Sequence, residues 1–265
     1  MVNLFVAAAL AAATPSPMPP APAAEPAMFV VRDADTTVYI FGTFHALDGQ
    51  SQWFSAPARD AFERSGELVL ETVVPTRPED VRAGPMIQAP SVTPSGSFLA
   101  TTRMAINAGR SQGMQVANGA DTVLRHMAEA TGKPVAGLET FQSQLAMFSH
   151  LRAAAPPPKA AARPGQSIAA SQMESLSSAL VEMQAAWKRG DQSVFVQMLA
   201  QLKTASPDTY RMMFTERNAR WADWIRARMQ TPGTVFVAVG AGHLAGEDSV
   251  LVRLAERGIP SRRVN

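Results

Sequence analysis

Four short apolar runs, each followed closely by a histidine or a glutamate, most constrain what this chain can fold into. They lie at residues 38–41, 67–70, 135–138 and 235–239. Their length and content are typical of buried strands. Helical patterns separate them, so the strands come mostly singly along the chain. This order predicts an α/β fold with a central, mostly parallel or mixed sheet that is flanked by helices.

The first and the last run end in the same pattern, G-x-x-H. Residues 42–45 read GTFH and residues 240–243 read GAGH. A glycine at a strand exit permits a sharp turn, so His45 and His243 are each expected just past the carboxyl end of a strand. Ligands bind at that edge of open α/β sheets. One such histidine would more often bond only a loop carbonyl, but two matched copies favour a shared site.

Two glutamates, Glu71 and Glu139, follow the middle runs in the same way. Two imidazoles and a carboxylate suit Zn, Mn, Co or Fe with positions left for water. Water bound to such a metal becomes nucleophilic near neutral pH, and a spare carboxylate can take its proton. A metal-free histidine and glutamate pair acting as a general base is also a coherent use. Structural roles stay open too: Glu71 could cap a turn, and Glu139 could begin a helix as an N-terminal charge.

An arginine is the less obvious candidate. A helix is expected at 208–230, and Arg217 shares one face of it with Met213, Trp221 and Trp224. An arginine in an apolar face is costly unless it is paired, and Glu71 or Glu139 would be the partner. Alternatively, its stem could lie along the edge of the face with the guanidinium in water.

Composition excludes several classes of function. The 265 residues are 46% hydrophobic, which is enough for a sizeable core. A formal net charge of +2 without basic clusters argues against nucleic-acid binding. The absence of cysteine excludes disulfides, thiol catalysis and zinc–thiolate sites. His126 and His150, the other two histidines, are expected to be solvated.

Other elements follow from periodicity and turn signals. A hairpin is expected at 28–32 and 36–41, and further helices at 55–65, 121–130, 142–151, 168–189, 191–203 and 247–257. Residues 74–97 give no clean pattern.

The first residues predict export. An apolar run at 4–13 is short for a membrane span but suits a secretory signal, and small residues follow it. No lysine or arginine precedes the run, so a disordered Ala/Pro-rich leader is the alternative. We therefore predict a leader at 1–24, a secreted or periplasmic protein, and one domain at 25–265 with a flexible Ala/Pro-rich loop at 153–167. No other segment is long enough to span a membrane.

The chain resembles the TraB/GumN family, which is related to the Tiki proteins and more distantly to erythromycin-esterase-like and ChaN-like folds. The matching stretches are VYIFGTFHAL (38–47), ELVLET (67–72), GADTVLRHMAEATGKPVAGLET (119–140), WKRGD (187–191), ERNARWADWI (216–225) and VAVGAGHLAGEDSVLVRLAERG (237–258). They occur in the family's order and span nearly all of the predicted domain.

The resemblance implies an α/β sheet whose paired G-x-x-H motifs and a glutamate form the site, and Tiki members are regarded as divalent-metal-dependent proteases. The family's motif residues fall on His45, His243, Glu71, Glu139 and Arg217. Two segments depart from the family, 74–118 and 153–167. Because they would shape a substrate cleft, specificity does not carry over.

Together these observations predict an exported, divalent-metal-dependent hydrolase of peptidase-like activity. His45, Glu71 and His243 would hold Mn, Co or Zn. Glu139 would act as a base or support the site, and Arg217 would orient groups or stabilise an oxyanion. The competing class is a non-catalytic protein that binds a peptide or small ligand at the same edge.

Overall fold

The computed structural model describes residues 24–49, 52–75, 96–150 and 168–265. All but the last residue of the predicted leader lies outside these ranges, as do the loop at 153–167 and most of the unassigned segment at 74–97. Within them, no helix is long and apolar enough to cross a membrane.

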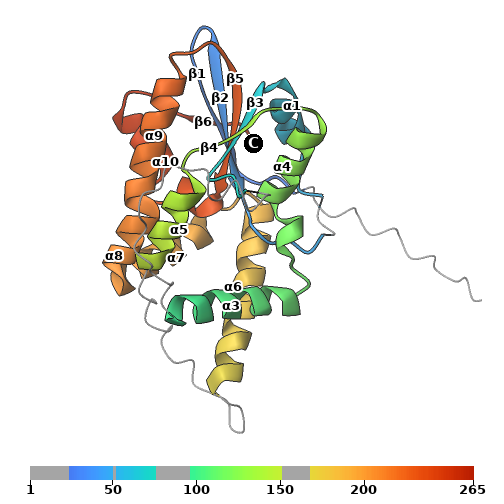
Figure 1. The fold of residues 1–265 in the computed structure, drawn as a ribbon, viewed down its shortest axis with the longest axis vertical. Coiled ribbons are helices and arrows are strands. Elements are labelled where there is room, and N and C mark those ends of the chain that lie inside the picture. The colour runs from blue at the N-terminus through green and yellow to red at the C-terminus, as the bar shows by residue number, and fades with distance from the viewer. Residues whose placement is uncertain (1–23, 50–51, 76–95, 151–167) are drawn as a thin grey trace, which may run out of the picture.

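Within the described ranges, one mixed sheet of six strands forms the centre of the fold (Figure 1), and a mostly parallel or mixed sheet is what the sequence predicts. Its spatial order is β4-β3-β5-β2-β1-β6. The strands are β1 (Met28–Arg32), β2 (Thr36–Thr43), β3 (Glu67–Leu70), β4 (Val135–Gly137), β5 (Gly233–Gly240) and β6 (Arg262–Arg263). The four neighbours β4, β3, β5 and β2 run parallel, whereas β1 pairs antiparallel with β2 and β6.

The register brings the carboxyl ends of the four parallel strands to one edge. Thr43, the last residue of β2, pairs with Gly240, the last residue of β5. Leu70 ends β3 and pairs with Ala238 on one side and Gly137 on the other. Residues that follow these strands therefore emerge side by side.

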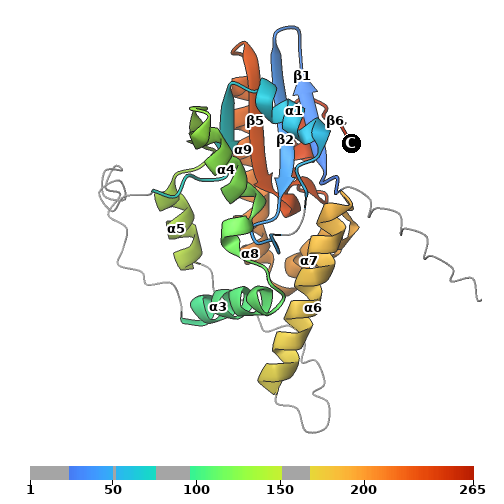
Figure 2. The ribbon, with the colours of Figure 1, turned by 90° about the vertical axis from the view of Figure 1, so that its right-hand side faces the viewer.

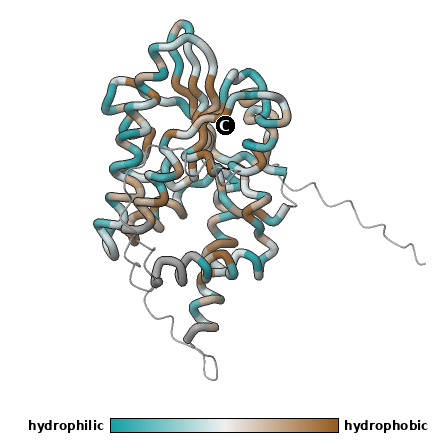
Figure 3. Tube along the Cα trace, in the orientation of Figure 1, coloured by the Kyte–Doolittle hydropathy of each residue, from teal (hydrophilic) through white to brown (hydrophobic). Residues whose placement is uncertain are grey.

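Helices cover both faces of the sheet (Figure 1). On one face lie α1 (Ala56–Arg64) and α4 (Ala120–Ala130), and on the other lie α9 (Glu216–Arg228) and α10 (Val250–Glu256). The alternation of strand side chains explains the two layers. Phe41 and Phe236 pack toward Phe62 of α1, whereas Ile40 and Val237 pack toward Ile225 of α9. Hydrophobic residues accordingly concentrate along the strands (Figure 3).

The remaining helices gather beyond the carboxyl edge of the sheet (Figure 2). They are α3 (Gly96–Ser111), α5 (Phe141–His150), α6 (Ile168–Lys188), α7 (Ser193–Ala205) and α8 (Pro207–Tyr210). The end of α6 is tied to the sheet because the indole N–H of Trp187 donates to the carbonyl of Gly42, 2.8 Å away. These helices therefore form a wall opposite the strand ends.

The structure differs from the sequence prediction at several elements, among them strand β6, and two of the differences lie beside the carboxyl edge of the sheet. Helix α3 was not expected, because Gly, Ser and Thr dilute its apolar pattern. The single helix expected at 208–230 is α8 and α9 joined by a π-helical turn, η2 (Arg211–Thr215). Such turns recur at functional sites, and this one ends two residues before Arg217.

Candidate active site at the carboxyl edge of the sheet

Four adjacent strand ends each deliver one of the predicted site residues. Along the edge the order is Glu139 after β4, Glu71 after β3, His243 after β5 and His45 after β2. The N–H of Glu139 donates to the carbonyl of Glu71 (3.0 Å), which extends the parallel pairing past the strands. The parallel register therefore gathers residues that are far apart in the sequence.

Arg217 reaches this edge from helix α9 and joins three of the four residues. Its Nη2 donates to Oε2 of Glu71 (2.6 Å) and to Oε1 of Glu139 (2.5 Å), and its Nε donates to Oε2 of Glu139 (3.2 Å). Its Nη1 lies 3.1 Å from Nε2 of His243. Burial by itself lowers the pKa of Arg217, but the two carboxylates outweigh it and raise the pKa. The guanidinium is therefore a fixed positive charge among the site residues.

His243 is buried between aromatic rings. The centroid of its ring lies 4.4 Å from that of Trp221 and 4.9 Å from that of Phe214. Its Nδ1 lies 2.6 Å from Oδ1 of Asn218, and its Nε2 is 3.7 Å from Oε1 of Glu71. Burial lowers the pKa of His243 to about 3, and Arg217 adds to this effect. The imidazole is thus neutral at physiological pH.

His45 has a different environment, because 61% of its side-chain surface is exposed. Its Nδ1 lies 3.1 Å from Oδ1 of Asp121, in the first turn of α4. Desolvation lowers the pKa of His45, but the hydrogen bond to Asp121 and the charges of Asp121 and Glu71 outweigh it and raise the pKa to about 9. His45 therefore carries a positive charge at neutral pH in the protein without ligand.

The contact between His45 and Asp121 depends on a close approach of two backbones. A Cβ atom on Gly119 would lie 2.2 Å from the carbonyl oxygen of His45. In addition, the N–H of Ala120 donates to the carbonyl of Phe44 (3.0 Å). Only a glycine lets α4 begin this close to the strand exit.

Glu71 lies at the centre of the group. Its Oε1 accepts a hydrogen bond from the N–H of Gly240 at 2.7 Å. Burial raises the pKa of Glu71, but the neighbouring His243, Arg217 and His45, together with this N–H, lower it to about 2. Of these groups, Arg217 and His45 carry their charge throughout the physiological pH range, so the carboxylate stays ionised.

Gly240 has no side chain, and three site residues converge on the space that a side chain there would occupy. A Cβ atom on this glycine would lie 3.1 Å from Oε1 of Glu71, 3.2 Å from Nε2 of His45 and 3.7 Å from Cδ2 of His243. The G-x-x-H glycine of β5 therefore makes room for the side chains of the site.

A cavity of about 1110 Å³ opens at this edge and is lined by His45, Glu71, Asp121, Arg217 and His243. Its opposite wall is mostly apolar and comes from helices beyond the sheet. The apolar residues there include Phe148, Leu180, Met183, Phe195, Met198 and Phe214. The volume exceeds that of most small-molecule sites, so the cavity can take a ligand larger than a single residue.

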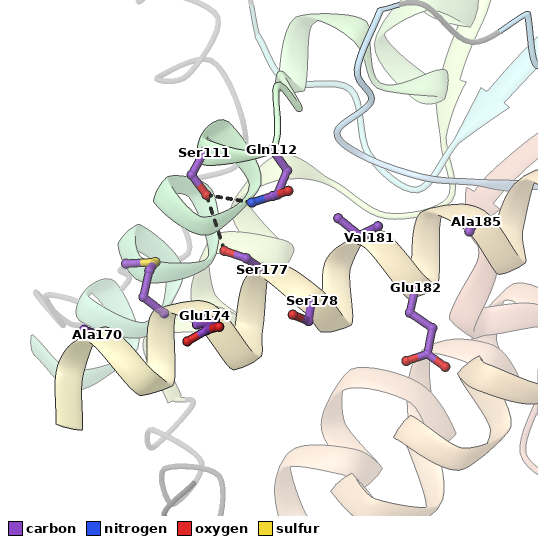
Figure 4. Close-up of a pocket in the computed structure, with 10 residues that line it drawn as sticks. Ser111, Gln112, Ala170, Glu174, Ser177, Ser178, Val181, Glu182 and Ala185 are labelled. Atoms are coloured by element: carbon purple, nitrogen blue, oxygen red, sulfur yellow. Dashed lines mark hydrogen bonds between the residues drawn. The ribbon is translucent and has the colours of Figure 1, made fainter. Parts of the chain in front are cut away.

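A second cavity, of about 680 Å³, lies along α6 and the end of α3 (Figure 4). Ser111 bonds Ser177 across the two helices there (3.3 Å), and Gln112 bonds Ser111. None of the five predicted site residues lines this cavity. The candidate site is therefore the cavity at the sheet edge.

The donor atoms fit a divalent cation only in part. Among the described residues, no group of three or more histidine, aspartate and glutamate side chains is arranged to hold a metal ion. His45 and Glu71 face one space, but Arg217 engages the Nε2 of His243. Nevertheless, each histidine has an oxygen on its Nδ1, which is the outer-shell arrangement of metal-binding histidines. Two buried hydroxyls that line the cavity, of Thr43 and Thr72, also have no partner within the described residues.

Sequence reasoning missed Asp121 and Asn218, the two residues that hold the histidines. Asn218 occupies the same buried face of α9 as Trp221, Ala222 and Ile225. An amide on an apolar face was the available signal, because a buried polar group needs a partner. Asp121 gave no comparable signal, since an acidic residue is common in the first turn of a helix. Of the two histidines expected to be solvated, His126 is exposed, and the side chain of His150 lies outside the described part.

Comparison with known proteins gives one match. The model of the TraB/PrgY/gumN family matches residues 27–101 and 84–263, which together span every strand and the whole candidate site. No curated protein and no solved structure matches the chain.

Proposed function

The chain belongs to the TraB/PrgY/gumN family, and from that premise we propose that it is an exported, peptidase-like hydrolase that uses a divalent cation. The observation that carries the proposal is the convergence of His45, Glu71 and His243 on the space beside Gly240. In both histidines the Nδ1 is held by an oxygen, which leaves the Nε2 for a ligand.

In this proposal His45, Glu71 and His243 hold Mn, Co or Zn. The cation would lower the pKa of a bound water and so supply a nucleophile near neutral pH. For His243 to offer its lone pair, Nη1 of Arg217 has to release it. The guanidinium is planar and rigid, and its Nη2 and Nε are bonded to Glu71 and Glu139. Release of the Nε2 of His243 therefore requires a shift of the histidine ring or of the whole guanidinium, not of Nη1 alone.

Glu139 and Arg217 support the site rather than act on a proton. Both carboxylate oxygens of Glu139 accept hydrogen bonds from Arg217. A carboxylate engaged in this way is poorly placed to take a proton from water. Arg217 in turn offsets the charges of Glu71 and Glu139, and it orients Glu71 toward Gly240. We therefore favour support over a general-base role for Glu139.

The apolar wall of the cavity suits a peptide with apolar side chains. Met183 and Met198 line it beside Phe195 and Phe214. Methionine side chains are flexible and polarisable, so such a wall adapts to side chains of different shape.

Export remains part of the proposal and rests on residues 1–24 alone. Immunoblots of periplasmic and cytoplasmic fractions, from cells with the intact chain and with a chain lacking residues 2–24, test it.

Metal content tests the cation directly. Protein purified without chelator is analysed by mass spectrometry as wild type and as His45→Ala and His243→Ala, with His126→Ala as the matched control. We expect stoichiometric metal in the wild type and the control, and a loss in both site variants. Metal at background in the wild type after incubation with Mn²⁺, Co²⁺ and Zn²⁺ would contradict the proposal.

Cleavage of a peptide library separates the remaining alternatives. We expect metal-stimulated cleavage beside apolar residues, abolished in His45→Ala. Cleavage that persists with chelator would instead indicate a metal-free histidine and glutamate hydrolase. Peptide binding without cleavage would indicate a binding protein, a second candidate that the bond between Arg217 and His243 favours because it occupies the Nε2 lone pair.

A further inference from the structure

Two consecutive residues of α9 hold the two nitrogens of one histidine. Asn218 bonds the Nδ1 of His243 at 2.6 Å, and Arg217 bonds its Nε2 at 3.1 Å. Asn218 is 1% exposed and does not line the cavity, so it can act on the site only through His243. Its position raises the question of what its amide does to the ring.

The other end of the Asn218 side chain decides which way the amide points. Its Nδ2 lies 2.7 Å from the carbonyl oxygen of Asp248. A carbonyl only accepts, so the amino group of Asn218 must face it. With the amide turned over, two acceptor oxygens would face each other at that distance. The Oδ1 of Asn218 therefore faces the Nδ1 of His243.

Asp248 is itself held firmly, so its carbonyl is a fixed reference point. Its Oδ2 accepts a hydrogen bond from the hydroxyl of Tyr210 at 2.9 Å, and Lys203 lies at the same oxygen. Its Oδ1 is bonded by Arg253. Side chains from helices α7, α8 and α10 thus hold Asp248 in place, and the carbonyl of Asp248 in turn orients the amide of Asn218.

We propose that Asn218 is a positioning residue that fixes His243 as the Nδ1-protonated tautomer and thereby keeps a lone pair on Nε2. An acceptor oxygen at Nδ1 requires a proton there, so Nε2 is the acceptor in a neutral ring. The guanidinium of Arg217, which can only donate, needs that lone pair as well. Both neighbours therefore select the same tautomer. The use of the lone pair for a cation rests on the proposed function, whereas the tautomer does not.

Nitrogen NMR reads the tautomer directly. The full chain, labelled with ¹⁵N-histidine and treated with chelator, is examined by long-range ¹H–¹⁵N correlation, and His243→Gln identifies the signals of His243. We expect Nδ1 to show the shift of a protonated nitrogen and Nε2 that of a bare one. Wild-type protein with the proton on Nε2 would overturn the proposal, whatever the Asn218 variants show.

Two substitutions separate the acceptor from mere packing. In Asn218→Leu, which removes the acceptor at similar volume, we expect the ¹⁵N shifts to move toward those of a tautomer mixture. In Asn218→Asp, which keeps an oxygen beside Nδ1, we expect the Nδ1 proton to remain. Asn107→Leu, on the exposed side of α3, is the matched control. Unchanged shifts in a folded Asn218→Leu protein would contradict the proposal, and Asn218→Ala serves if the leucine variant does not fold.

Metal binding to the same proteins keeps the two proposals apart. We expect at least a tenfold weaker affinity for Mn²⁺ or Zn²⁺ in Asn218→Leu and a smaller loss in Asn218→Asp. If the wild type shows the Nδ1-protonated tautomer but binds no metal, the proposed function fails and the role of Asn218 stands. If the wild type binds metal but its His243 carries the proton on Nε2 after chelation, the proposed role of Asn218 fails and the proposed function stands.

Discussion

Nη2 of Arg217 lies 2.6 Å from Oε2 of Glu71, which joins a helix to a strand end 146 residues away in the sequence. The side chain of Arg217 is 4% exposed and that of Glu71 is 13% exposed, and the same nitrogen also bonds Glu139. Two carboxylates and one guanidinium thus share a site with little access to water. Because ions of one sign repel strongly in such surroundings, this arrangement makes the arginine a structural requirement of the site.

Replacement of Arg217 should therefore reduce stability as well as activity. In Arg217→Met, Glu71 and Glu139 lose their shared cation, and we expect the free energy of unfolding to fall by about 3–5 kcal/mol in urea titrations. The matched control is Arg226→Met on the exposed side of α9, which should change it by less than about 1 kcal/mol. Adding Glu139→Gln to Arg217→Met should recover part of the loss. Equal stability of the two arginine variants would show that the carboxylates do not depend on Arg217.

The convergence beside Gly240 can be tested with a single methyl group. In Gly240→Ala the new Cβ would crowd Oε1 of Glu71 and Nε2 of His45. Since both neighbours are side chains that can shift, we expect the fold to persist while metal affinity and cleavage fall at least tenfold. Gly66→Ala is the control, because the nearest atom to its Cβ would be 3.8 Å away. Metal affinity like that of the control would mean that His45 and Glu71 do not act together.

Much of this site could be predicted because local patterns encode it. Strand runs are recognisable from a few residues, and in a parallel sheet every carboxyl end emerges at the same edge. That rule alone places His45, Glu71, Glu139 and His243 together. Arg217 could be predicted from the cost of a charge on an apolar helix face.

Other features depend on contacts that no local pattern records. The strand order, which puts β5 between β3 and β2, follows from the packing of the whole sheet. The pairing of Asp121 with His45 depends on where α4 begins in space. The link from Asn218 to Asp248 spans 30 residues, and strand β5 lies between the two in the sequence. Helix α3 was missed because tertiary packing against α6 stabilises it despite its weak intrinsic pattern.

The pair of His45 and Asp121 makes a prediction about pH. The pKa of His45 is raised to about 9, chiefly because the bond and charge of Asp121 outweigh desolvation. A raised pKa contributes stability that is fully present below pH 6.5 and is lost as the pH rises through about 9. In chelator-treated protein, we expect the ring protons of His45 to titrate near pH 9. The midpoint should fall in Asp121→Asn and stay unchanged in Asp60→Asn, a substitution on the exposed face of α1. Equal midpoints in all three proteins would show that Asp121 does not control the charge of His45.

Gly119 should be among the least replaceable glycines, although its backbone conformation is ordinary. Its φ is −56°, so strain in the backbone is not the reason. The reason is the carbonyl of His45, which would lie 2.2 Å from a Cβ atom and cannot move without displacing the strand exit. In Gly119→Ala, α4 has to shift away and carry Asp121 with it, at a cost of about 1–3 kcal/mol in the free energy of unfolding. Gly109→Ala is the control, because its Cβ would meet only side-chain atoms, the nearest of them 3.6 Å away. Because the shift separates Asp121 from His45, the titration midpoint of His45 should fall together with stability in Gly119→Ala. A loss of stability with an unchanged midpoint would mean that α4 positions Asp121 independently of this contact.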